Sequence, residues 1–63
     1  MSTLQEVKEI ITEKLKYDEF TAAMIISYLP GRAERTIYSV LNQLVQQGVI
    51  SREKESKIVI FRK

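Results

Sequence analysis

The segment from Gly31 to Gly48, GRAERTIYSVLNQLVQQG, constrains the fold more than any other part of the chain. Its apolar residues recur at i, i+3, i+4, i+7 and i+8, the spacing of one stripe along a helix that faces a core. They are Ile37, Val40, Leu41, Leu44 and Val45. The opposite side is polar and carries no acid, with Arg35, Ser39, Asn42 and Gln46 in line and Thr36 and Gln43 beside them. We predict an amphipathic helix over about residues 33–47.

The polar face of this helix has two interpretations. Side chains of these types form hydrogen bonds with phosphates and base edges, and Arg and Asn are favoured partners of guanine and adenine. The simpler interpretation is a solvated helix face. The residues on either side of the helix discriminate between these two interpretations.

Charge is distributed unevenly along the chain. Residues 1–30 hold three basic and five acidic side chains, whereas residues 31–63 hold seven basic and three acidic ones. A basic second half predicts contact with a polyanion.

Composition excludes several classes of site and protein. The 63 residues include no Cys and no His, which excludes disulfides, thiol nucleophiles and the usual zinc ligand sets. No nucleotide-binding or metal-binding loop motif is present, so we expect no catalytic residue, cofactor, metal or small-molecule substrate. The short apolar runs predict neither a signal peptide nor a membrane span, and hence a cytoplasmic protein. A chain of this length predicts one domain, residues 1–63, with a small core.

The first half of the chain predicts two helices and a short extended segment. Thr3 and Glu6 have the spacing of a capping box, which places a helix at about residues 3–16. Residues 17–20 favour a connector or brief strand. Thr21 is an N-cap candidate for a helix from Ala22 to about Tyr28, which Pro30 and Gly31 end.

The chain after Gly48 predicts a β-hairpin over about residues 49–62. Gly48 suits the left-handed position that ends a helix. Residues 49–52 and 57–62 are β-prone, and residues 53–56 between them contain no two-residue turn signal, so we expect a loop of about four residues. In the second strand Ile58 and Ile60 share one face and Val59 and Phe61 the other. If helices cover one side of the sheet, one of these pairs is exposed.

These elements predict a core with a contribution from every helix. Helix 22–28 is expected to bury Ala22, Ile25, Ile26 and Leu29. The residues expected at the centre are Leu4, Val7, Ile11, Leu15, Ile25, Leu29, Ile37, Leu41, Leu44, Ile50 and one face of the last strand.

The order of elements and one stretch of residues together suggest a known family. Helix, short strand, helix, turn, helix and hairpin is the order of an α+β winged helix-turn-helix domain with a C-terminal two-stranded wing. The run TIYSVLNQLVQQGVISREK, residues 36–54, resembles the recognition helix, glycine cap and wing entry of penicillinase-repressor-type regulators. Residues 20–23, FTAA, resemble the start of that family's second helix.

This resemblance implies a repressor that binds specific sequences in double-stranded DNA. Helix 33–47 would enter the major groove and the wing would follow the backbone. Tyr38 would reach a phosphate. The full set of expected DNA-binding residues is Arg32, Arg35, Thr36, Tyr38, Ser39, Asn42, Gln43, Arg52, Lys54 and Lys57.

The chain departs from these repressors at two places. They carry an additional C-terminal dimerisation segment, whereas this chain stops at Lys63, directly after the wing. We still expect a homodimer, paired through helix 3–16, where Ile10 lies at the edge of the apolar stripe, or through the exposed face of the hairpin. The second departure is Ala33, a poor helix cap where the family commonly has Ser or Thr.

The alternative function is a winged helix that binds another protein within a larger assembly. Glu34, Glu53 and Glu55 on the expected DNA side favour it, as do apolar residues that the fold leaves exposed; Met24, Tyr28, Val59 and Phe61 are the candidates. The uneven distribution of charge favours DNA.

Overall fold

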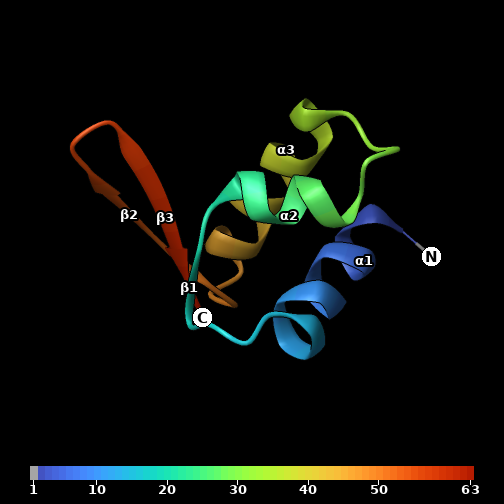
Figure 1. Ribbon diagram of the computed structural model, residues 1–63. Helices are drawn as coiled ribbons and strands as arrows, with labels where there is room; N and C mark the ends of the chain where they lie inside the picture. Colours follow the sequence, from blue (N-terminus) through green and yellow to red (C-terminus); the bar gives the residue numbers. More distant parts are fainter. Residues whose placement is uncertain (1) are drawn as a thin grey trace.

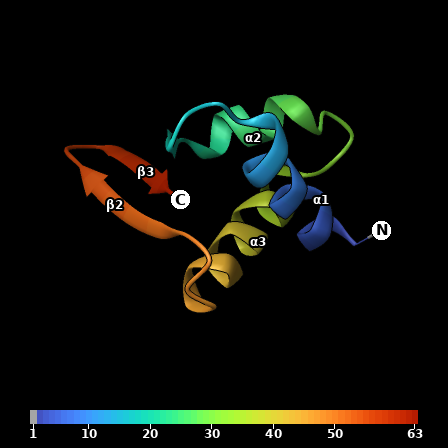
Figure 2. The ribbon, with the colours of Figure 1, turned by 90° about the horizontal axis from the view of Figure 1, so that it is seen from below.

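Three helices and a three-stranded antiparallel sheet make up the computed structural model, which describes residues 2–63 (Figure 1). The elements are α1 (Thr3–Glu9), a π-helical turn η1 (Ile10–Lys14), β1 (Glu19–Phe20), α2 (Ala22–Tyr28), α3 (Glu34–Gln46), β2 (Ser51–Glu55) and β3 (Ile58–Arg62). This confirms the predicted α+β winged-helix layout. We call the β2–β3 hairpin the wing; it projects away from the helices on the side opposite α1 (Figures 1 and 2).

The first helix begins at Thr3, as predicted, but differs from the prediction in its cap and in its C-terminal end. Its N-cap is Ser2, whose Oγ accepts a hydrogen bond from the Gln5 amide at 3.3 Å, so the predicted Thr3–Glu6 capping box is wrong. The helix stops at Lys14 rather than about residue 16, because Leu15 is extended. In the last turn the Leu15 amide donates to the Ile10 carbonyl at 2.9 Å, which is π-helical pairing.

The short strand β1 connects the first half of the chain to the wing. The strand order is β1-β3-β2, and Phe20 lies opposite Phe61. Their rings stack with centroids 5.8 Å apart and planes 21° apart, and both are buried. This aromatic pair fixes the base of the wing against the helices.

The hairpin turn is shorter than predicted. Glu55 pairs with Ile58, so the loop contains only Ser56 and Lys57, and the expected four-residue loop at 53–56 is wrong. Ser56 takes a positive φ of 57°, which gives the tight turn without the usual Gly or Asn. Because β2 extends to Glu55, its side chains alternate between the two faces of the hairpin over residues 51–55, and Lys54 belongs to this regular strand rather than to the loop.

The core contains most of the expected residues. Ala22, Val40 and Phe61 lie buried on faces that were expected to face the core, and Ile10 and Phe20 are buried in addition. Leu4, Ile26 and Leu29 are only partly buried. Ile10 is packed within the monomer rather than at the exposed edge of the helix, so its side chain is not available to a dimer contact. Val59 and Phe61 form the covered face of β3, and Ile58 is exposed.

The end of α3 is set by Gly48, as predicted. Gly48 has a φ of 79°. Its amide donates to the Val45 carbonyl at 3.1 Å, and the Val49 amide donates to the Leu44 carbonyl at 3.0 Å. These two bonds form a Schellman motif, which turns the chain directly from α3 into β2. Among residues 2–63, no helix has the length and apolar character needed to cross a membrane.

Candidate nucleic-acid interface

The exposed side of α3 carries six of the residues expected to bind DNA. Ile37, Val40, Leu41 and Leu44 are buried, so the polar side of the helix faces solvent. Arg35, Thr36, Tyr38, Ser39, Asn42 and Gln43 are all exposed. At about 100° per residue, Tyr38 and Asn42 lie on one flank of this side and Thr36 and Gln43 on the other.

Arg52 and Lys54 lie on a different face of the wing from its acidic residues. In the β2–β3 register Arg52 lies opposite Phe61 and Lys54 opposite Val59, so these four side chains share what we call the inner face. Since Phe61 is buried against the helices, Arg52 and Lys54 point to the α3 side of the wing.

The acids of the wing lie on the other side, which we call the outer face. It is formed by Ser51, Glu53, Glu55, Ile58, Ile60 and Arg62. Glu53 and Glu55 therefore do not face the surface that carries Arg52 and Lys54, so two of the three acids that argued against DNA binding lie away from it.

One hydrogen bond joins α3 to the wing. A guanidinium nitrogen of Arg52, Nη1, donates to Oδ1 of Asn42 at 3.3 Å. The structure thus brings together two expected site residues that are ten positions apart. It makes the polar side of α3 and the inner face of the wing one continuous surface.

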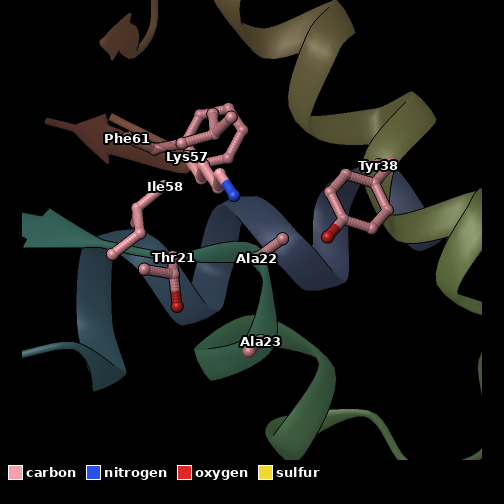
Figure 3. Close-up of a pocket in the computed structure, with 8 residues that line it drawn as sticks. Thr21, Ala22, Ala23, Tyr38, Lys57, Ile58 and Phe61 are labelled. Atoms are coloured by element: carbon pink, nitrogen blue, oxygen red, sulfur yellow. The ribbon is translucent and has the colours of Figure 1, made fainter. Parts of the chain in front are cut away.

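Two of the expected residues, Tyr38 and Lys57, line an open pocket of about 370 Å³ between α2, α3 and β3, which Ile58, Val59 and Phe61 of β3 also line. In Figure 3 the Tyr38 hydroxyl points toward the start of α2, and Lys57 extends into the same space from the wing. Thr21 also lines the pocket and makes no capping hydrogen bond with its side chain. The sequence assigned Thr21 only to a cap, and no sequence signal placed it beside Tyr38.

Arg32 lies apart from these residues. It belongs to the loop between α2 and α3, which is on the far side of the molecule from the wing (Figure 1). Its Nη2 is 2.6 Å from Oε1 of Glu6, on α1. This ion pair holds Arg32 against the acidic first helix.

Arg62 forms ion pairs with two acidic residues of the sheet. It donates a hydrogen bond to Glu19 and lies 3.5 Å from Glu53, and the bond to Glu19 followed by the charge of Glu53 raises the pKa of Arg62. Within residues 2–63, Arg35, Lys54 and Lys57 take part in no ion pair. Their charges are therefore available to an external anion. Glu34, in the first turn of α3, remains an acid on this side.

The side chains of this surface are hydrogen-bond donors and cations. No group of three or more His, Cys, Asp or Glu side chains within residues 2–63 is arranged to hold a metal ion. Exposed donors on α3 and unpaired cations on the wing suit hydrogen bonding to an anionic, extended partner.

Comparison with known proteins agrees with this surface. The family model described as penicillinase repressor matches residues 3–63. No curated protein and no solved structure matches the chain. The family match confirms the resemblance seen in residues 36–54.

Proposed function

We propose that this chain, which belongs to the penicillinase repressor family, recognises a specific DNA sequence with α3 in the major groove and the wing along the backbone. The family assignment makes the chain a DNA-binding transcriptional regulator. The observation that supports the finer proposal is the continuous surface of α3 and the inner wing face, which the Asn42–Arg52 hydrogen bond joins.

The residues of α3 would supply sequence specificity. Arg35 and Asn42 are seven positions apart, which is about two turns and about 10 Å along the axis, a span of a few base pairs. The rigid helix holds their side chains at fixed separations. Arg35, Thr36, Ser39, Asn42 and Gln43 are the proposed base-contacting set.

The wing and the neighbouring pocket would supply affinity. Lys54 on the inner face and Lys57 at the tip have no acidic partner within residues 2–63, so both charges are free to meet phosphates. Tyr38 and Lys57 line one pocket, and we propose that a phosphate contacts its mouth. Arg32 would join the interface only by leaving Glu6.

The proposal includes a homodimer. One domain recognises only a short half-site, which gives weak specificity, and a second copy adds a second half-site. Because Ile10 on the first helix is buried, we place the contact on the outer wing face, the second of the two expected surfaces. It presents Ile58, which is 58% exposed.

A salt titration on two variants tests the division between α3 and the wing. Asn42→Ala should weaken the preferred duplex by about 1–3 kcal/mol and leave random DNA almost unaffected. Lys54→Ala with Lys57→Ala should weaken both duplexes alike and flatten the slope of log K against log salt by about one per lost contact. Gln47→Ala, at the exposed C-cap of α3, serves as the control.

The exposed apolar side chain of Ile58 keeps a protein-interaction module as the second candidate. The same titration separates the two functions. If the parent protein binds no duplex even in dilute salt, the DNA proposal fails and the protein-interaction module replaces it.

A further inference from the structure

The Asn42–Arg52 contact fixes which way the Asn42 amide faces. Nη1 of Arg52 is 3.3 Å from the Asn42 side-chain oxygen. A guanidinium group has only donors, so the atom that faces it is the amide oxygen and not the amide nitrogen. The Nδ2 group, with its two hydrogens, is therefore the part of Asn42 that makes no bond to Arg52 and keeps its full hydrogen-bonding capacity for a ligand.

This orientation bears on the choice of base. An Asn side chain recognises adenine through two bonds, in which its oxygen accepts from N6 and its nitrogen donates to N7. Here the oxygen already accepts a hydrogen bond from Arg52, so the amino group of adenine would have to bind its second lone pair, directly beside the positive charge of the guanidinium. Guanine presents two acceptors, N7 and O6, which suit the two hydrogens of the Asn42 Nδ2 group.

We infer that Arg52 is a specificity-determining positioning residue, which orients Asn42 so that α3 prefers guanine to adenine at the base pair that Asn42 contacts. The inference rests on the proposed function, since it requires α3 to lie in the major groove. Arg52 acts in it through Asn42, in addition to any phosphate that it binds itself.

Lys54 provides a matched control for Arg52. Both are exposed, both lie on the inner face of β2, and each contributes one positive charge. Within residues 2–63, Lys54 forms neither an ion pair nor a side-chain hydrogen bond with Asn42. Replacing either residue by Met keeps an unbranched stem and removes the charge, but only Arg52→Met releases the Asn42 oxygen.

The experiment starts from a duplex selected from random DNA with the parent protein. Affinities are then measured for duplexes in which each G·C pair is replaced by A·T, with the parent, Arg52→Met, Lys54→Met, Asn42→Ala and the Asn42→Ala/Arg52→Met double variant. The quantity compared is the ratio of the adenine and guanine dissociation constants, because the loss of one charge lowers the affinity for both duplexes and cancels from the ratio.

We expect one position at which the parent prefers guanine and Arg52→Met shifts the ratio toward adenine by about tenfold. Lys54→Met should leave that ratio unchanged. Asn42→Ala should abolish the preference at the same position, and adding Arg52→Met to it should produce no further shift, because the two residues act as one unit.

Three results would overturn the inference and leave DNA binding itself intact. They are an unchanged ratio in Arg52→Met, an equal shift in Lys54→Met, and no change in preference at any position in Asn42→Ala. Failure of the parent protein to enrich or bind any duplex would overturn the proposed function, and the inference with it.

Discussion

Leu41 shows how much a single residue contributes to a core of this size. It is fully buried in the middle of α3, within a core that α1, α2 and β3 complete. Leu41→Ala should lower the free energy of unfolding by about 2–5 kcal/mol, because the removed carbons leave a cavity. That is a large share of the stability of any small domain.

Urea denaturation followed by circular dichroism measures this loss. Gln43→Ala, two positions along and exposed, is the control and should change stability by less than about 0.5 kcal/mol. Equal midpoints for the two variants would show that the buried stripe of α3 is assigned to the wrong side.

A second prediction for a single residue concerns Glu6, whose replacement should strengthen DNA binding. Its ion pair with Arg32 is partly exposed, so Glu6→Gln should cost less than about 1 kcal/mol of stability. It should also release Arg32, raise the affinity for random DNA and steepen the salt slope by up to about one unit.

Glu9→Gln is the control for the loss of charge itself, because Glu9 is an exposed acid of α1 with no ion pair within residues 2–63. If both variants raise the affinity equally, the effect is general electrostatics and Arg32 has no part in it.

At the scale of elements, the end of α3 sets where the wing begins. Gly48 has a φ of 79°, a conformation that costs a residue with a Cβ atom about 1–2 kcal/mol. A Cβ atom at Gly48 would meet no other atom within 4 Å. Gly48→Ala should therefore destabilise by that conformational cost alone, measured as a fall in the denaturation midpoint.

Gly31→Ala is the matched comparison. A Cβ atom there also meets open space, and Gly31 does not have a positive φ. We expect Gly31→Ala to be neutral or to stabilise by up to about 1 kcal/mol, because it restricts the unfolded chain. A loss of stability as large as that of Gly48→Ala would contradict this explanation.

The elements that local pattern specifies are those that the sequence predicted well. The 3.6-residue period of Ile37, Leu41 and Leu44 required a helix with one buried side, and the structure has it. The two faces of β3 were equally apolar, so local pattern gave no reason to bury Phe61 rather than Ile60. Stacking on Phe20, 41 positions earlier in the chain, decides it.

The candidate site depended still more on distant contacts. The residue types of the site could be read from the sequence. The hydrogen bond between Arg52 and Asn42 and the position of Glu53 on the outer face could not, because both follow from the register of the strands. Register in turn depends on a two-residue turn at Ser56, which has no common sequence signal.

At the scale of the whole molecule, the charge asymmetry along the sequence becomes a separation of surfaces. Arg35 on α3 and Arg52 and Lys54 on the inner wing face form no ion pair within residues 2–63, whereas Glu19, Glu53 and Glu55 lie with Arg62 on the other side of the sheet. The outer face is therefore mixed in charge around an exposed apolar residue, which suits contact with a second copy rather than with DNA.

The outer face gives the last prediction, which concerns assembly. At micromolar concentration the parent chain should sediment at twice its monomer mass of 7.3 kDa. Ile58→Lys should sediment as the monomer, because a charge replaces the exposed apolar side chain of the contact. The new Lys would lie opposite Glu55 in the hairpin, where opposite charges stabilise the strand pair, so the fold should persist.

Tyr17→Lys is the control, since Tyr17 is 67% exposed and lies outside the wing, and this variant should remain dimeric. A 7.3 kDa parent species both free and with DNA would contradict the dimer.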